Sequence, residues 1–122
     1  MRILIVDNQP RARQSMKALL DAWYPNEEMH EARNGMEAAK LAEEFLPDLI
    51  LMDARMPGMN GLEATRVIKA RWPQVKIIVL SMYPEFEADA LAAGADAFVS
   101  KNDLPEKLRE TLKKIAGKKF GE

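Results

Sequence analysis

Four polar residues stand at the ends of short apolar runs in this sequence: Asp7, Asp53, Ser81 and Lys101. Two carboxylates held close together repel one another and raise each other's pKa unless a cation lies between them. Such hard oxygen ligands suit Mg²⁺, which commonly takes one or two carboxylates and keeps several waters. A lysine and a small hydroxyl facing the same carboxylate are the partners that a phosphoryl group on it needs. If the fold gathers these residues, they predict a phosphoryl-transfer site with an aspartyl nucleophile.

Asp53 has the most informative surroundings of the four. Residues 49–52 form an uninterrupted apolar run, which is typical of a strand buried on both faces of a parallel sheet. A loop rich in proline and glycine follows at once, at residues 54–61. Open α/β folds place their ligand chemistry at this C-terminal end of the strands. We therefore expect Asp53 at the point where a buried strand meets solvent.

Short apolar strands alternate with amphipathic helices along the whole chain. The apolar runs predict strands at residues 3–6, 28–32, 49–52, 76–80 and 97–100. Helical spacing of apolar residues predicts helices at residues 10–23, 38–45, 64–72, 85–93 and 104–115. Strict alternation of this kind calls for an α/β fold with a parallel sheet and helices on both faces. The three most apolar strands should be central, which fits the doubly wound, flavodoxin-like order 2-1-3-4-5.

Several residues at helix ends add local detail to this prediction. Asn34 is expected to cap the second helix, and Pro10 suits the first turn of the first helix. Asp103 and Glu106, three residues apart, predict a capping box at the start of the last helix.

The bulk properties fit one small domain and exclude several classes of function. A chain of 122 residues is long enough for a single core, and a net charge of −1 gives no reason to expect nucleic acid or an anionic membrane as its partner. The absence of cysteine excludes disulfides, thiol catalysis and thiolate metal sites. No signal peptide or membrane span is predicted, so a soluble, cytoplasmic protein is expected. We divide the chain into a domain at residues 1–116 and a polar tail, or the start of a linker, at residues 117–122.

Together these motifs resemble the receiver domain of bacterial two-component response regulators. The resemblance covers roughly residues 2–116. No single motif is specific alone, but the order and spacing of the motifs together are specific. The matching pieces are Ile3-Leu4-Ile5-Val6-Asp7, Leu51-Met52-Asp53, Met56-Pro57-Gly58-Met59-Asn60-Gly61, Ser81, Gly94-Ala95-Asp96-Ala97-Phe98 and Lys101. The stretch Lys101-Asn102-Asp103-Leu104-Pro105 is more similar to regulators with a helix-turn-helix output domain than to the chemotaxis type.

The resemblance implies a role for each residue of the predicted site. Asp53 would accept a phosphoryl group from a phosphohistidine of a sensor histidine kinase. Asp7 would bind or orient Mg²⁺, together with Asp53 itself and the backbone carbonyl of Arg55. Ser81 would hydrogen-bond the phosphoryl oxygens, and Lys101 would pair with them. The domain would be a signalling switch, not an enzyme of the ordinary turnover kind, although it would catalyse its own phosphorylation and dephosphorylation.

The resemblance also implies a switching surface. Phe98 matches an aromatic position whose rotamer follows the state of the hydroxyl residue, here Ser81. Inward movement of the two side chains would reshape the surface of the fourth helix, the fifth strand and the last helix. This would control transcription through an output domain outside these 122 residues, which would be the only route to DNA. Both a monomer and a homodimer formed on phosphorylation are compatible with the sequence.

Asn8 is the main departure from the family's pattern, because the family usually carries two adjacent acids at Asp7 and the next position. An amide offers a carbonyl oxygen but no charge, so we expect weaker Mg²⁺ binding, since ligand charge tunes affinity at such sites. Two interpretations of Asn8 stay open: a modest metal ligand, or a cap for the helix led by Pro10. A degenerate receiver that binds a partner without phosphorylation is therefore the alternative function. A metal-dependent phosphatase is disfavoured, because Asp7-Asn8-Gln9 lacks the second acid of an Asp-x-Asp motif.

Overall fold

The structure is a computed structural model that describes residues 1–56 and 58–115. Pro57, which belongs to the predicted loop, and the predicted tail at residues 117–122 lie outside the described residues. Five strands and five α-helices alternate within the described part: β1 Arg2–Val6, α1 Pro10–Trp23, β2 Glu28–Ala32, α2 Gly35–Phe45, β3 Leu49–Asp53, α3 Gly61–Arg71, β4 Lys76–Ser81, α4 Glu87–Ala92, β5 Ala97–Ser100 and α5 Glu106–Ile115. No helix in this part of the chain is long and apolar enough to cross a membrane.

The strands form one parallel sheet in the order β2-β1-β3-β4-β5, which confirms the predicted topology. β1 and β3 are neighbours, with Val6 opposite Met52. β3 and β4 are also neighbours, with Asp53 opposite Leu80. Because all strands run the same way, the residues that follow β1, β3, β4 and β5 reach the same edge of the sheet.

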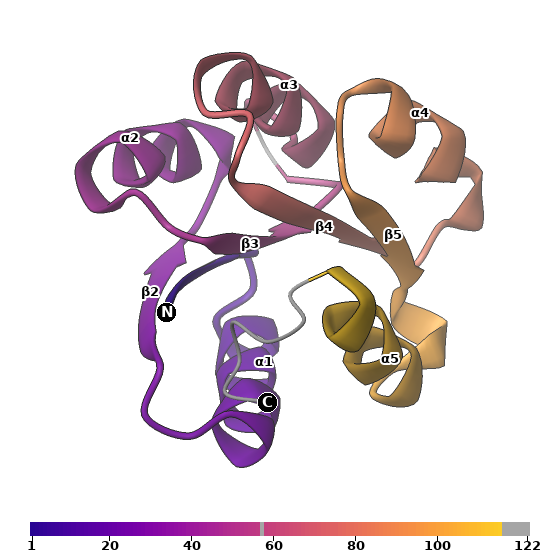
Figure 1. Cartoon of the computed structure of the whole chain (residues 1–122). Coiled ribbons are helices and arrows are strands. Elements are labelled where there is room, and N and C mark those ends of the chain that lie inside the picture. The colour runs from indigo at the N-terminus through magenta and orange to yellow at the C-terminus, as the bar shows by residue number, and fades with distance from the viewer. Residues whose placement is uncertain (57, 116–122) are drawn as a thin grey trace.

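Two separate cores form on the two faces of the sheet. Helices α2, α3 and α4 cover one face, and α1 and α5 cover the other (Figure 1). The face under α2–α4 is packed with small helix residues that let the helices lie close to the strands: Ala38, Ala42, Ala64 and Ala90. The face under α1 and α5 is filled by larger ones: Met16, Leu20, Leu108 and Leu112. β1, β3 and β4 are buried on both faces, as their uninterrupted apolar runs predict.

The helix starts explain two of the asparagines and correct one interpretation. Asn34 caps α2 by accepting a hydrogen bond from the backbone N–H of Glu37 (2.8 Å), as predicted. Asn60 caps α3 in the same way. The residue that caps α1 is Gln9, without a side-chain hydrogen bond, so the interpretation of Asn8 as a helix cap is wrong.

The start of the last helix also differs from the prediction. Residues Lys101–Asp103 form a 3₁₀ turn (η2), in which the Ser100 hydroxyl accepts a hydrogen bond from the backbone N–H of Asn102 (3.2 Å). Leu104 is extended, as expected for a residue before proline, and α5 begins only after Pro105, at Glu106. Asp103 is therefore too far back to cap α5, and the predicted capping box is wrong. The predicted fourth helix is likewise divided into a 3₁₀ turn, η1 (Pro84–Phe86), and the shorter α4.

Candidate functional site

Three of the predicted site residues meet at the C-terminal edge of the sheet. The ammonium nitrogen of Lys101 lies 2.8 Å from Oδ2 of Asp7 and 3.3 Å from Oδ1 of Asp53. Asp7 and Asp53 come from the neighbouring strands β1 and β3, whereas Lys101 follows β5 and reaches past the end of β4. Both aspartates are buried. The fold thus places two buried carboxylates against one shared cation.

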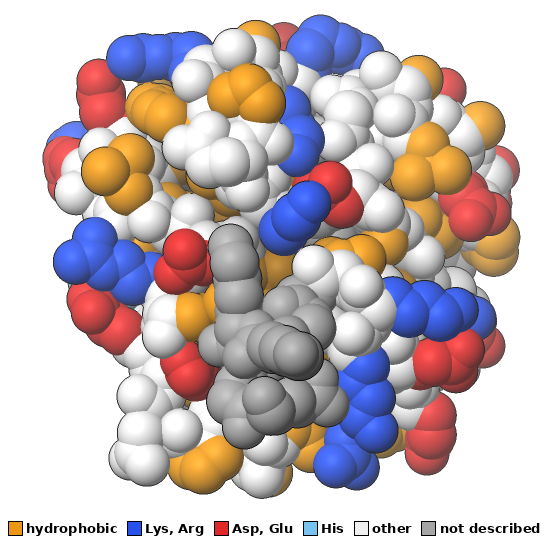
Figure 2. Space-filling view, viewed as in Figure 1, with side chains coloured by type: hydrophobic (Ala, Val, Ile, Leu, Met, Phe, Trp, Pro, Cys, Tyr) orange, Lys and Arg blue, Asp and Glu red, His pale blue; other side chains and the backbone are white. Residues whose placement is uncertain are grey.

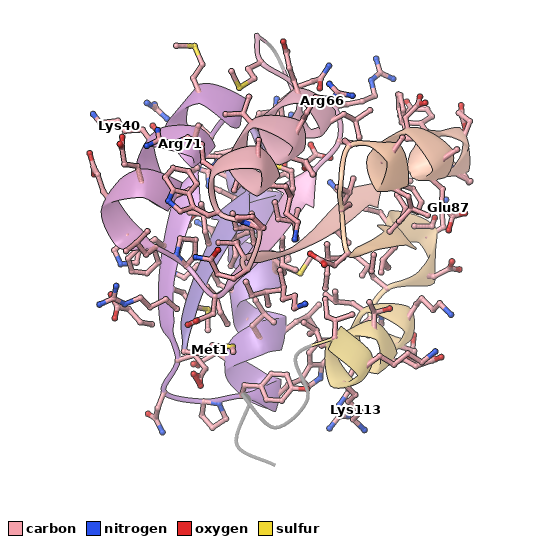
Figure 3. The ribbon with its side chains drawn as sticks, turned by 45° about the horizontal axis from the view of Figure 1, so that its top comes forward. Met1, Lys40, Arg66, Arg71, Glu87 and Lys113 are labelled. Atoms are coloured by element: carbon pink, nitrogen blue, oxygen red, sulfur yellow. The ribbon has the colours of Figure 1, made fainter. Side chains whose placement is uncertain are left out.

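Other cations do not balance this cluster within the part of the chain that the structure describes. No further Lys or Arg there forms an ion pair with Asp7 or Asp53. Figure 3 shows Lys40, Arg66 and Arg71 on α2 and α3, directed towards solvent. The site therefore carries a formal surplus of one negative charge when both carboxylates are ionised.

Burial and the shared cation act in opposite directions on the site's protonation. Burial is the main cause that raises the pKa of Asp53 above its ordinary value. The charge of Lys101 opposes this rise, the charge of Asp7 adds to it, and a hydrogen bond from the backbone N–H of Arg55 lowers it slightly. For Lys101 burial acts to lower the pKa, but the hydrogen bond to Asp7 and the charges of both carboxylates outweigh burial and raise it. Lys101 is therefore held in its charged form.

Asp7 is fixed in place by two further contacts, one of which sequence reasoning missed. Its Oδ1 accepts a hydrogen bond from the backbone N–H of Gln9 (2.9 Å), and its backbone carbonyl accepts one from the guanidinium of Arg13 (2.6 Å). Arg13 also pairs with Glu31 of β2 (2.8 Å), which lowers the pKa of Glu31. Arg13 thus joins α1 to the end of β1 and to β2, a contact that only the folded chain reveals, since no local pattern links residues 13 and 31.

Ser81 and Phe98 lie near this cluster but do not bond to it. Ser81 ends β4 one residue beyond the register partner of Asp53, and it is buried. Its hydroxyl accepts a hydrogen bond from the backbone N–H of Tyr83 (3.0 Å) and makes none to the two carboxylates in the described part of the structure. Phe98, on β5, is half-buried and packs against the core under α2–α4. The structure therefore places Ser81 at the correct edge without bringing its hydroxyl onto Asp53.

Two predicted metal ligands, Asn8 and Arg55, lie beside the carboxylates. Asn8 is half-buried, and its amide has no hydrogen-bond partner among the described residues. The side chain of Arg55 is exposed, and its guanidinium carbon stands 4.9 Å from the centre of the Tyr83 ring. Its predicted contribution comes from the backbone carbonyl, so the side chain is free to cover the site.

The loop after Asp53 folds back onto the strand end, and Gly61 allows this. The backbone N–H of Gly61 donates to the carbonyl of Ala54 (3.1 Å). A Cβ at Gly61 would collide with the backbone carbonyl oxygen of Asp53, so any larger residue would displace the strand end that carries the carboxylate. The sequence motif contains Gly61, but the motif does not show that this residue lies against the backbone carbonyl of Asp53.

The donor set at this edge suits a hard divalent cation of modest affinity. Asp7, Asp53, the carbonyl of Arg55 and the amide of Asn8 offer only oxygen donors. A cation would also balance the surplus negative charge and would oppose the rise in the pKa of Asp53 that burial causes. Within the described residues no group of three or more His, Cys, Asp or Glu is placed to hold a metal ion. The residues present therefore fit Mg²⁺ with fewer charges than a three-acid site.

Comparisons with known proteins agree with this geometry. The family model of the response regulator receiver domain matches residues 3–113. The chain is 37% identical over 116 residues to the nitrate/nitrite response regulator protein NarL of Escherichia coli (strain K12), covering 93% of this chain and 54% of NarL. It is 34% identical over 118 residues to the transcriptional regulatory protein DegU of Brevibacillus brevis, covering 95% of this chain and 50% of DegU. The chain thus spans about half the length of the curated relatives it matches.

Solved structures give the same result at the level of the fold. The response regulator protein TrrA of Thermotoga maritima, solved in complex with Mg(2+)-BeF, superposes with a TM-score of 0.84 at 36% identity, over 93% of this chain and 96% of that one. A DNA-binding response regulator of the LuxR family from Staphylococcus aureus gives a TM-score of 0.82 at 32% identity, again over 93% and 96%.

Proposed function

The chain belongs to the family of response regulator receiver domains, and from this premise we propose that Asp53 accepts a phosphoryl group from a phosphohistidine of a sensor histidine kinase. The observation that carries this proposal is the contact of one ammonium, that of Lys101, with both Asp53 (3.3 Å) and Asp7 (2.8 Å). A structural ion pair needs only one carboxylate. The second one gives the site a nucleophile beside a preformed cation.

The transfer step follows from this arrangement. A carboxylate oxygen of Asp53 attacks phosphorus, the bond between phosphorus and the imidazole nitrogen breaks, and the electron pair remains on the imidazole. Lys101 opposes the effect of burial on the pKa of Asp53, and in the proposed step it then pairs with the phosphoryl oxygens. In the separate dephosphorylation step water attacks the phosphorus, the bond between phosphorus and the Asp53 oxygen breaks, inorganic phosphate is released, and Asp53 leaves as a carboxylate.

The metal ligands in this proposal are the carboxylates of Asp7 and Asp53, the backbone carbonyl of Arg55 and the amide oxygen of Asn8. Mg²⁺ bound there supplies positive charge against the oxygens of the transferred group. Arg13 and Gln9 hold Asp7 in position for this role.

Switching would pass from the site to the surface formed by α4, β5 and α5. Ser81 would exchange its bond with Tyr83 for one to the phosphoryl group, and Phe98 would follow it inward. Figure 2 shows hydrophobic and acidic side chains together over α4, where Leu91, Glu87 and Asp89 are exposed. Moving a two-state equilibrium from 1:99 to 99:1 takes about 5.5 kcal/mol, and charge-assisted contacts to a phosphoryl group supply roughly 1.5–3 kcal/mol each.

The regulated process in this proposal is transcription. The matched relatives include transcriptional regulators about twice as long as this chain, so we assign DNA contact to an output domain outside the 122 residues. Residues 1–116 would form the receiver and residues 117–122 a tail or the start of a linker. The domain would act in the cytoplasm, apart from any membrane, as a monomer or as a homodimer formed on phosphorylation.

Labelling with a small phosphodonor tests the proposal directly. The purified chain is incubated with Mg²⁺ and acetyl phosphate or phosphoramidate, and acyl-phosphate formation is followed by mass. Asp53→Asn should abolish the added mass, whereas Asp21→Asn, an exposed acid on α1, should leave it unchanged. Labelling of Asp53→Asn to the native extent would overturn the assignment of the acceptor.

Asn8 supports one alternative, a degenerate receiver that binds a partner without being phosphorylated. Beryllofluoride with Mg²⁺ separates the two functions, because it imitates the phosphoryl group without a transfer step. In the phosphorylated-switch proposal, millimolar Mg²⁺ and beryllofluoride shift the NMR signals of Ser81 and Phe98. Unchanged signals under these conditions favour the degenerate receiver.

A further inference from the structure

An apolar pocket of about 130 Å³, open on one side, lies between α1, the sheet and the segment before α5. Its inner wall consists of buried side chains from three strands and one helix: Ile5, Leu51, Leu80 and Met16. Its outer side is formed by residues nearer the surface, among them the exposed Ser15 and the half-buried Ala12 and Leu104. The two small side chains of α1 leave space that a larger residue would fill.

The chemistry of this wall determines what can occupy it. A buried water needs two to four polar partners, and this lining is almost wholly apolar. Asp7 and Lys101 also line the cavity, but the ammonium of Lys101 is already directed at Asp7 and Asp53. What remains for an occupant is the methylene chain of Lys101. An engineered apolar cavity of similar size, about 150 Å³, binds benzene or xenon.

We propose that this cavity is a binding site for a small, uncharged, apolar molecule about the size of benzene. The volume is well below the roughly 300–1,000 Å³ of pockets that hold drug-sized ligands, which excludes nucleotides and larger effectors. The ligand lies against the methylene chain of Lys101, the residue that bridges the two site carboxylates. The pocket is therefore a ligand site that shares Asp7 and Lys101 with the cluster around Asp53, and binding there does not depend on phosphorylation.

Titration of the unphosphorylated chain with benzene tests the proposal. Methyl NMR signals of Ile5, Leu51 and Leu80 should shift and saturate, and the ε-methylene signal of Lys101 should shift over the same concentration range. The methyl signals of the exposed Leu46 and Leu91 serve as controls for surface contact. Xenon under pressure should shift the same wall methyls without any substitution.

A matched pair of variants assigns the effect to the cavity. Ala12→Leu places three further carbons in the cavity and should weaken benzene binding by at least about tenfold, a change of 1.4 kcal/mol. Ala22→Leu makes the same change on the exposed side of α1 and should leave the affinity unchanged. Ser15→Leu serves as a second filling variant if Ala12→Leu does not fold. Shifts that do not saturate, that appear equally at Leu46 and Leu91, that omit Lys101, or that persist in both filling variants would overturn the proposal.

Discussion

Two lysine–carboxylate clusters lie at opposite edges of the sheet, and they differ in how completely the lysine is used. At the N-terminal edge, Lys69 of α3 donates to the carbonyls of Pro73 and Val75 (2.9 Å each) and to Oδ2 of Asp96 (3.1 Å). These three acceptors match the three donors of an ammonium group. The same oxygen of Asp96 accepts a hydrogen bond from the backbone N–H of Ile77 (2.8 Å). This cluster is closed and joins α3 to the start of β4 and β5.

The cluster at the C-terminal edge is open by comparison. Lys101 faces two carboxylates and, in the described part of the chain, donates to no backbone carbonyl. The pKa of Asp53 is raised, mainly by burial, which shows that one carboxylate is incompletely stabilised. A lysine whose three N–H donors all have acceptors in the protein stabilises the fold. A lysine shared by two carboxylates leaves one negative charge that a bound cation can balance. This difference in hydrogen-bond partners is why we assign a structural role to the Lys69 cluster and propose a functional role for the Lys101 cluster.

The largest expected effect comes from opening the closed cluster. Asp96→Asn should lower the free energy of unfolding by about 2 kcal/mol, because hydrogen bonds to charged groups are worth roughly 1.5–3 kcal/mol and Lys69 would face a neutral amide. Urea denaturation measures the change. Asp89→Asn, at an exposed position of α4, is the matched control and should cost almost nothing. Equal midpoints for the two variants would contradict a structural role for the Lys69–Asp96 pair.

The second prediction adds the missing charge to the open cluster. Asn8→Asp should raise Mg²⁺ affinity by at least about tenfold, because ligand charge tunes affinity at hard-cation sites. The same variant should be less stable than the native chain in EDTA, since a third carboxylate joins two that already share one cation. Calorimetric titration with Mg²⁺ measures the affinity. Asn26→Asp, in the turn before β2, adds the same charge far from the site and should leave the affinity unchanged; an equal gain there would show a general charge effect.

The two clusters were not equally visible in the sequence, and the reason is geometric. Parallel strands bring their C-terminal ends to one edge, so a polar residue after each apolar run was enough to predict that Asp7, Asp53 and Lys101 meet. The Lys69–Asp96 pair joins a helix to a strand start 27 residues later, and no periodic pattern marks it. The fold followed from apolar runs because burial on both faces of a strand leaves a strong local signal.

The sequence predictions are wrong at two helix starts, where a short sequence motif conflicts with the local backbone conformation. The spacing of Asp103 and Glu106 is that of a capping box, yet Pro105 forces Leu104 into an extended conformation and delays α5. Asn8 could equally have capped α1, and only the observed start at Pro10 after Gln9 excludes it. Single-residue roles at element ends depend on where the backbone turns, which a sequence pattern specifies only within a few residues.

The third prediction removes the surplus charge from the open cluster. Asp53→Asn should raise the free energy of unfolding by roughly 1 kcal/mol at neutral pH in EDTA, a size common for a single stabilising substitution. The physical reason is that the neutral amide avoids both the burial of a charge and repulsion from Asp7, while Lys101 keeps its bond to Asp7. Urea denaturation measures this. Asp53→Asn and Asp96→Asn should therefore change stability in opposite directions, and a loss in both would remove the distinction between the clusters.

The stabilisation by Asp53→Asn should also depend on pH. A carboxyl whose folded-state pKa is raised holds its proton more tightly in the folded protein, so its contribution to stability is present at low pH and lost as pH rises through that pKa. The advantage of Asp53→Asn over the native chain should accordingly be small near pH 3.8, the ordinary value, and grow above it. Paired denaturation series in EDTA across this range test the sign. An advantage that shrinks with rising pH would mean that Lys101 overcompensates for burial.

The smallest expected effect concerns how the open cluster is covered. Arg55 and Tyr83 follow Asp53 and Ser81 by two residues each and stack on one another at the surface (4.9 Å from guanidinium carbon to ring centre). Removing the guanidinium with Arg55→Ala should speed hydrolysis of phosphorylated Asp53 roughly threefold, because a closed side-chain cover excludes water from a reactive group. Loss of the phosphoryl group after removal of the donor measures the rate. Arg66→Ala, on the outer side of α3, is the control (Figure 3). Equal hydrolysis rates in the two variants would show that the Arg55 side chain does not shield phosphorylated Asp53 from water. The burial of Asp53 would then be its protection.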